Sequence, residues 1–151
     1  MEVIVQRTPP SVNRLAVGSS RSWHKYAREK KSWEQEIGWL LRMQRKLWRI
    51  PERIIHVDAT AELRFPDYRR RDAGNYGALL EKVTGDTLQM LGLLPDDTPE
   101  FYRWTSATFD PYSGPSQTAL KLTIQRETKF MRTKREYEEE IASQRTGGTE
   151  R

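Results

Sequence analysis

The clearest pattern in the chain is the alternation of apolar and polar residues from 54 to 65. Such alternation is typical of a half-buried β-strand, because successive side chains point to opposite faces of a sheet. The apolar side carries Ile55, Val57, Ala59, Ala61, Leu63 and Phe65, and the polar side carries His56, Asp58, Thr60, Glu62 and Arg64. Three more strands are predicted at 1–5, 101–109 and 118–125, with 110–116 as a hairpin-like connection between the last two.

Two long segments have the periodicity of amphipathic helices instead. From Ser22 to Pro51, apolar residues recur at steps of three, four and seven, which predicts one long helix that ends at the proline. Its stripe consists of Tyr26, Trp33, Ile37, Leu40, Leu41, Leu47 and Trp48, and its tryptophans are expected in the core. A second helix is predicted from Asp72 to Leu91, ended by Gly92. Along one edge of it lie Asn75, Lys82 and Asp86.

The order of these elements predicts the fold class. Strand, helix, strand, helix, strand, strand and a helix around 133–143 indicate an α+β (α/β) protein, a mixed sheet of about four strands packed by two main helices. The length of 151 residues suits one domain. We expect this domain to span 1–127, followed by a short charged C-terminal helix and a flexible tail in 128–151.

The net charge and its distribution along the chain indicate which classes of partner the protein can bind. The net charge is +5, and residues 1–53 hold 12 Lys/Arg against 5 Asp/Glu. Such a basic field favours nucleic acid or another anionic surface. The chain has no cysteine, which excludes disulfides and cysteine-based zinc sites, and His24 and His56 lack ligand-like spacing. Without an apolar run of about 18 residues or a basic signal-like start, we expect a soluble, cytoplasmic protein with no membrane partner.

Candidate chemistry lies in residues 68–77, YRRRDAGNYG, where Arg69, Arg70 and Arg71 run into Asp72. The arginines can bind a polyanion while the aspartate binds a metal ion; a solvated loop is the alternative. Mg²⁺ prefers oxygen ligands and needs only two or three carboxylates from different elements. The candidate carboxylates are Asp67, Asp72, Asp86, Asp96 and Asp97.

Distance along the second helix limits how these carboxylates can combine. Asp72 and the pair Asp96/Asp97 would lie about 30 Å apart if the helix between them were straight. A shared site therefore requires a break near Gly85, or a loop 93–97 that folds back toward residue 72. In the alternative interpretation, Asp72 caps the helix and the aspartate pair only terminates a turn.

Three segments in this order resemble the RusA-type Holliday junction resolvases over residues 8–125. TPPSVNR is similar to the Pro-Pro-Ser-x-Asn loop of that family, RRRDAGN to its Arg-rich Asp-x-Asp-Asn motif, and LGLLPDD to its Gly-x-x-x-Asp-Asp turn. By position, Asp72 and Asp97 match the metal-binding aspartates, with Asp96 beside the second. Asn13 and Asn75 match the two asparagines of the motifs, and Lys82 lies near the place of an essential lysine.

One position departs from the family pattern. Gly74 stands where the second aspartate of the Asp-x-Asp pair is expected. Either Asp86 or Asp96 completes the site, or the nuclease is weakened or lost. Asp86 is the preferred substitute, because it shares a helix edge with Asn75 and Lys82.

The resemblance implies a Mg²⁺-dependent endodeoxyribonuclease, with Mn²⁺ as a possible substitute and no small-molecule cofactor. It would act as a homodimer on four-way DNA junctions in a bacterial or phage-infected cell, each protomer nicking one strand. Asp72, Asp97 and Lys82 would be catalytic, and Asp72, Asp86, Asp96 and Asp97 would supply the metal ligands. DNA would be bound by Asn13, Arg14, Arg69, Arg70, Arg71 and Asn75. The alternatives are a nuclease for other branched DNA, such as flaps or forks, and a junction-binding protein without catalysis.

Overall fold

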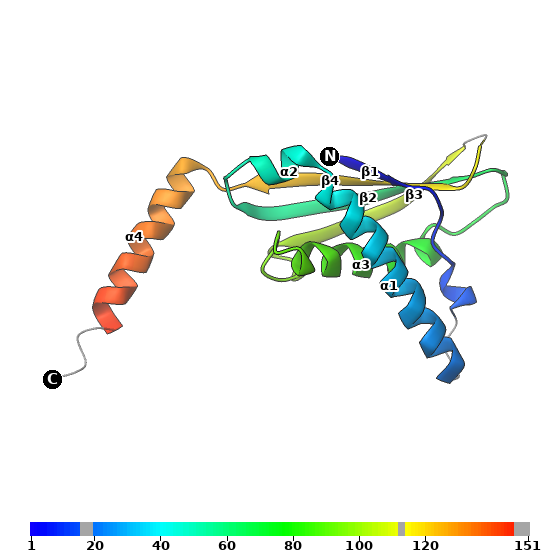
Figure 1. Ribbon diagram of the computed structural model, residues 1–151, viewed down its shortest axis with the longest axis horizontal. Coiled ribbons are helices and arrows are strands. Elements are labelled where there is room, and N and C mark those ends of the chain that lie inside the picture. Colours follow the sequence, from blue (N-terminus) through cyan, green and yellow to red (C-terminus); the bar gives the residue numbers. More distant parts are fainter. Residues whose placement is uncertain (16–19, 112–113, 147–151) are drawn as a thin grey trace.

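The computed structural model describes residues 1–15, 20–111 and 114–146, and its centre is a four-stranded mixed sheet (Figure 1). The strands are β1 (Glu2–Val5), β2 (Ile54–Phe65), β3 (Tyr102–Pro111) and β4 (Gln117–Arg126), in the order β1-β4-β2-β3. β4 runs antiparallel to both β1 and β2, whereas β3 runs parallel to β2. The predicted α+β class and four-stranded mixed sheet are confirmed.

The predicted hairpin between the last two strands is wrong. β3 and β4 do not pair with each other, because β2 lies between them: Leu63 is opposite Phe109 on one side and Thr118 on the other. Because β2 and β3 are parallel, a tight turn cannot connect them. The chain passes from β2 through α3 and then pairs as β3 with one edge of β2. The other edge of β2 is then open to β4. Residues 112–113 of the connection lie outside the described part of the chain.

The predicted helix from Ser22 to Pro51 is two helices, α1 (Ser20–Arg42) and α2 (Arg45–Arg49). The break allows Leu47 to turn back into the core, where it is buried. The indole of Trp48 then donates a hydrogen bond of 3.0 Å to the carbonyl of Leu41. The same carbonyl also accepts a hydrogen bond of 3.1 Å from the backbone N–H of Gln44, so it has two partners from beyond the end of α1. Trp48 itself is 45% exposed, so its predicted place in the core is wrong.

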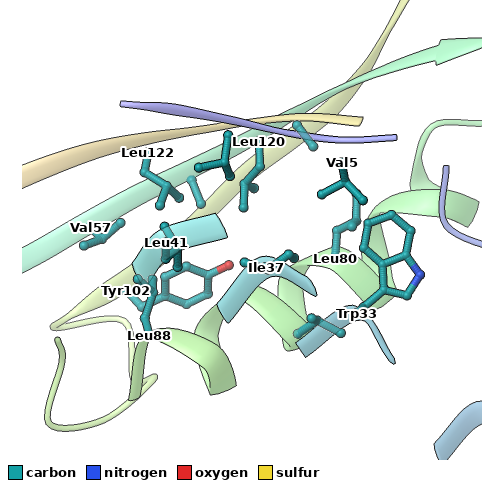
Figure 2. Close-up of a cluster of buried hydrophobic side chains, with 14 of the residues drawn as sticks. Val5, Trp33, Ile37, Leu41, Val57, Leu80, Leu88, Tyr102, Leu120 and Leu122 are labelled. Atoms are coloured by element: carbon teal, nitrogen blue, oxygen red, sulfur yellow. The ribbon is translucent and has the colours of Figure 1, made fainter. Parts of the chain in front are cut away.

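The core lies between one face of the sheet and the helices α1 and α3 (Gly74–Met90), as Figure 2 shows. Trp33, Ile37 and Leu41 project from α1, and Leu80 and Leu88 from α3. They meet the apolar sides of β1, β2 and β4, represented by Val5, Val57, Leu120 and Leu122. The core role predicted for Trp33 is confirmed, and so is the burial predicted for Val57, Ala59, Ala61 and Leu63. The prediction for Ile55 is wrong: the register of β2 is irregular between Ile54 and His56, and Ile54 is buried in its place, while Phe65 is only partly buried against the core.

α3 is continuous through Gly85, so a break in the helix does not shorten the distance between the candidate carboxylates. Its C-terminus is closed at Gly92, which has φ +69°, by bonds from Gly92 N to Gln89 O and from Leu93 N to Leu88 O. This left-handed cap reverses the chain direction. The loop 93–97 consequently folds back beside α3, but it reaches Lys82 and Gly85 and not residue 72, so neither of the two arrangements that a site shared with Asp72 requires is present.

The last helix, α4 (Lys129–Thr146), is longer than the predicted 133–143. Within the described residues it packs against no other helix or strand, and it projects away from the sheet in Figure 1. Residues 147–151 of the expected tail lie outside the described part. None of the helices described is long and apolar enough to cross a membrane.

Candidate functional site

The strongest cluster of charged groups joins α3 to the loop that follows it. The ammonium of Lys82 donates hydrogen bonds to Asp86, one helical turn away at 2.8 Å, and to Asp97, in the loop at 2.9 Å. Lys82 is 52% exposed, so this ion pair network faces solvent and is open to a ligand. Two carboxylates from separate elements thus converge on one cation.

A second lysine reaches the same cluster from α1. The ammonium of Lys30 lies 2.7 Å from the other carboxylate oxygen of Asp86, and it also pairs with Glu34. Burial raises the pKa of Asp86, but the hydrogen bonds from Lys30 and Lys82 outweigh it and leave the pKa below its usual value. The hydrogen bonds to Asp86 and Asp97 raise the pKa of Lys82 far above its usual range. Asp86 is therefore ionised and Lys82 protonated at neutral pH.

Gly85 allows the loop to approach α3 this closely. A side-chain Cβ at Gly85 would lie 3.1 Å from the ring of Tyr102 and 3.2 Å from Cβ of Asp97. Tyr102 is buried, and its hydroxyl donates to the carbonyl of Glu81 at 3.0 Å. Beside Lys82 and Asp97, a cavity of about 510 Å³ opens between α3 and the start of β3, with Arg103 and Trp104 on its wall.

The other two candidate aspartates have local roles in this structure. Asp72 Oδ1 accepts a hydrogen bond of 3.0 Å from the backbone N–H of Gly74, at the start of α3. Asp96 Oδ1 accepts one of 2.8 Å from the N–H of Asp97, which shapes the turn. Asp72 lies ten residues before Lys82, roughly 15 Å along the helix. The folded-back loop therefore brings Asp97 to Lys82 and Asp86, and not to Asp72.

The set of oxygen donors decides whether a divalent metal ion fits here. Among the residues described, no three His, Cys, Asp or Glu side chains form a metal-binding group. Mg²⁺, however, is commonly held by one or two carboxylates together with waters and substrate phosphates. Asp86 and Asp97 already hold a cation between them at hydrogen-bonding distance. A pair of carboxylates of this kind would suit a Mg²⁺ ion in place of the ammonium of Lys82, with waters or a phosphate as the remaining ligands.

The three arginines at 69–71, called the arginine loop below, differ in their surroundings. One side chain packs on the protein, and the other two are free to contact a ligand. Arg71 pairs with Asp67 at 2.7 Å and lies over the ring of Phe65, 3.9 Å from its centroid. With only 16% of its side chain exposed, Arg71 holds the loop on the sheet. The side chain of Arg69 is 84% exposed, and its Nε lies 3.8 Å from Oδ2 of Asp67, a longer and weaker ion pair than that of Arg71. Arg70 is also exposed, and within the described residues it has no ion-pair partner.

The N-terminal loop meets the arginine loop in space. Residues 7–11 and Arg14 share with residues 69–71 a polar cavity of about 610 Å³. Arg7 fixes this wall to α1 by donating to Glu36 at 2.8 Å and lying over the ring of Trp33. Asn13 lies in the short helix η1 (Val12–Arg14), which packs near α3. Two of the three segments identified in the sequence are therefore neighbours at one end of α3.

The predicted site residues thus form two groups along α3. Asn13, Arg14, Arg69, Arg70 and Asp72 surround the start of the helix, while Lys82, Asp86 and Asp97 form the cluster near its end. Asn75 lies on the first turn, about two turns before Lys82 on the same edge. Sequence reasoning did not place Lys30 in the site, and it considered Gly85 only as a possible helix break, because the residues that these two contact are distant in the chain.

Comparison with known protein families and with curated proteins gives no match to this chain.

Proposed function

We propose that this protein is a metal-dependent endonuclease that cuts branched DNA, with the four-way junction as its substrate. The observation that carries the proposal is the position of Lys82 between Asp86 and Asp97, beside an open cavity. The exposed arginines at the other end of the same helix supply the positive charge that a polyanion needs. The resemblance of the three motifs to RusA-type resolvases supports the substrate class.

Each side chain of the cluster has a distinct task in this proposal. Asp86 and Asp97 would hold Mg²⁺, which when bound neutralises charge on the phosphate and promotes deprotonation of an attacking water. Lys82, released from the two carboxylates by the metal ion, would carry a positive charge, the ordinary state of a lysine side chain at neutral pH. Its role is to stabilise negative charge on the phosphate oxygens. Asp72 accepts the hydrogen bond from the backbone N–H of Gly74 and so caps the start of α3.

The basic groups bind the DNA arms on either side of the cut. Arg69, Arg70 and Arg14 line or border the polar cavity with their guanidinium groups available for phosphates. The arginine loop lies roughly 15 Å from Lys82 along α3. This distance corresponds to about four phosphate spacings of one strand along a DNA duplex. A junction needs two symmetric cuts, so we propose that two copies of the chain act on one DNA molecule, each nicking one strand.

A junction-binding protein without catalysis is the second candidate. It is favoured by the distance of Asp72 from the cluster, and by the use of both carboxylates to neutralise Lys82. This protein would bind the four-way junction through the same arginines. It would not cut the DNA, whichever divalent metal ion is present.

The test compares three labelled substrates of the same sequence, a four-way junction, a three-way junction and a linear duplex. The full chain is incubated with each in Mg²⁺, Mn²⁺ or EDTA. The proposal predicts paired nicks in the four-way junction, loss of cutting in EDTA, and little cutting of linear DNA. Preferential cutting of the three-way junction would indicate a fork or flap nuclease. Tight junction binding without nicks in either metal would establish the non-catalytic candidate.

A further inference from the structure

The cavity of about 510 Å³ between α3 and β3, called the α3–β3 cavity below, differs in charge from the cavity at the arginine loop. Its charged lining residues are two acidic and two basic ones, Glu81, Lys82, Asp97 and Arg103. The cavity at the start of α3 is instead lined by arginines, with Glu29 as its acidic residue. A phosphate is therefore attracted to the arginines, whereas the α3–β3 cavity suits a group without net charge.

Trp104 gives the α3–β3 cavity an aromatic wall. Its indole lies against α3 at Gly77, where a side-chain Cβ would be 3.7 Å from Nε1 and 3.8 Å from Cζ2 of the ring. The side chain is only partly buried against the core, so part of the ring is accessible from the cavity. An accessible aromatic ring can stack on a flat ligand, and every nucleobase has a flat face. The wall therefore favours a planar ring as the ligand.

Glu81 adds a hydrogen-bond acceptor to the same cavity. Its side chain is exposed, and its carboxylate has no ion-pair or hydrogen-bond partner in the part of the chain that the structure describes. Burial, and after it the negative charge of Glu81, raise the pKa of the Tyr102 hydroxyl, so this carboxylate lies near another lining residue. An ionised carboxylate accepts hydrogen bonds and donates none. It suits a ligand with an amino group, which adenine, cytosine and guanine have and thymine lacks.

We propose that the α3–β3 cavity binds one unpaired nucleobase that carries an exocyclic amino group. The ring stacks on Trp104, and the amino group donates a hydrogen bond to Glu81. This inference rests on the proposed function, because it takes branched DNA as the ligand. Lys82 and Asp97 line the same cavity, so the base belongs to a nucleotide next to the phosphate that is cut.

The cavity accounts for a preference for branched DNA. A base can enter it only after leaving the stack of the double helix, and extrusion costs least for a base that is already unpaired. The stack is interrupted at a branch point, so the bases there reach the cavity more readily than those of a linear duplex. Contacts between arginines and phosphates carry no such information, because every DNA has the same backbone.

Other ligands fit the α3–β3 cavity less well. A phosphate would meet the carboxylates of Glu81 and Asp97, which repel it. An apolar partner would cover four charged side chains without giving them hydrogen bonds, which is unfavourable. A nucleobase combines an apolar face with a polar edge and so matches both kinds of lining residue.

The test measures binding of the full chain to four-way junctions in EDTA, so that the result does not depend on cutting. In a series of junctions, each nucleotide next to the branch point is replaced in turn by an abasic nucleotide, which removes the base and keeps the phosphate. At one of these positions we expect the affinity to fall about tenfold, as expected when one stacked base is lost. Trp104→Leu should weaken binding to the intact junction by a similar factor. It should bind the abasic and the intact junction equally, because the base and the indole act as one pair.

Two further variants separate stacking from a general structural effect. Trp39→Leu removes an exposed indole from α1, outside the cavity, and should respond to the abasic nucleotide as the unmodified chain does. Trp104→Phe keeps a flat ring and should retain most of the response. Circular dichroism should show that all variants keep their helix content.

The amino group is tested by changing the base at the sensitive position. The unmodified chain should bind junctions with adenine, cytosine or guanine there about tenfold more tightly than the junction with thymine. Glu81→Ala, an exposed substitution that helices tolerate, should remove this preference and keep the response to the abasic nucleotide.

Two results would overturn the base site: an abasic nucleotide that has no effect at any position, or one that weakens binding equally in the unmodified chain and in Trp104→Leu. Nicking of the same junctions in Mg²⁺ distinguishes this failure from failure of the proposed function. A chain that nicks intact and abasic junctions alike, and binds them alike, is a nuclease without the base site. A chain that shows the predicted binding but makes no nicks has the base site without the nuclease.

Discussion

The ammonium of Lys82 donates a hydrogen bond of 2.9 Å to Asp97, a residue 15 positions further along the chain. The bond exists because Gly92 reverses the chain and Gly85 lets the loop lie close against α3. Through this bond, Lys82 and Asp97 form one charged cluster with Asp86 and Lys30. The proposed nuclease depends on this cluster.

The cluster should make stability depend on pH through Asp86. Its pKa is lowered from the usual 3.8 in the folded chain, so its contribution is present above that value and is lost as the pH falls through the folded pKa. The pKa of Lys82 is raised from 10.5, so its contribution is present below 10.5 and is lost only at more alkaline pH. Between these limits Asp86→Asn should lower the free energy of unfolding by about 1 kcal/mol.

Urea unfolding from pH 3 to pH 9 checks this dependence. The difference between the unmodified chain and Asp86→Asn should be constant above about pH 5 and should shrink below 3.8. A difference that grows as the pH falls would have the wrong sign for a carboxylate stabilised in its ionised form.

Two glycines in helix interiors should respond in opposite ways to alanine. At Gly38 in α1 a Cβ meets only Thr87 Cγ2, at 3.6 Å, so Gly38→Ala should stabilise the protein by about 1 kcal/mol through helix propensity. At Gly85 the same Cβ would lie 3.1–3.2 Å from Tyr102 and Asp97, and Tyr102 is held by its bond to Glu81. Gly85→Ala should therefore destabilise by about 1 kcal/mol, because overpacking exceeds the gain in propensity.

Thermal unfolding of the two alanine variants measures this contrast. Gly85→Ala should also reduce DNA cleavage, since it displaces Asp97 from Lys82, whereas Gly38→Ala should leave cleavage unchanged. Equal stabilisation by both substitutions would show that the loop 93–97 is free to move away from α3.

The exposed arginines should determine how DNA affinity depends on salt. Each phosphate contact contributes about 0.9 to the slope of log affinity against log salt concentration. Replacing both Arg69 and Arg70 by alanine should therefore lower the slope by about 2. Lys121→Ala, on the opposite face of the sheet, is the control and should not change it. Binding titrations of a four-way junction between low and moderate salt give the slope, and an unchanged slope in the double variant would exclude these contacts.

Arg71 should behave differently from its two neighbours. Arg71→Ala removes a 2.7 Å ion pair with Asp67 and the contact with the ring of Phe65, so it should lower the free energy of unfolding by about 1 kcal/mol. Its effect on the salt slope should be small. A normal melting temperature together with a reduced slope would instead make Arg71 a phosphate ligand.

Buried residues recur at regular steps in the sequence, so the strands and helices that contain them could be predicted. The alternation in 54–65 and the helical spacing of Trp33, Ile37 and Leu41 both mark residues that lie in the core. The break after Arg42 leaves no such trace, because Leu47 continues the stripe whether the helix bends or not. The position of β2 between β3 and β4 depends on a crossover that local patterns do not specify.

The site was predictable by residue type but not by arrangement. Asp86, Lys82 and Asp97 stood out as charged groups near helix edges and turns, yet their contact depends on how the loop after Gly92 folds back. The three consecutive arginines look alike in sequence. Only the packing of Arg71 on Phe65 separates it from Arg69 and Arg70.

The most direct test of the proposed nuclease is the rate at which the full chain nicks a labelled four-way junction in Mg²⁺, measured beside Asp97→Asn. Asp110→Asn, which removes a carboxylate from the opposite face of the sheet, is the matched control. We predict that Asp97→Asn lowers the rate at least about 100-fold, as expected when a group that holds a catalytic ion is lost. Asp110→Asn should cut at the normal rate, and Asp72→Asn should lose less than about tenfold, because the carbonyl of an asparagine can still accept the bond from Gly74. Normal cutting by Asp97→Asn, or loss of cutting by Asp72→Asn alone, would contradict a site built on Lys82, Asp86 and Asp97.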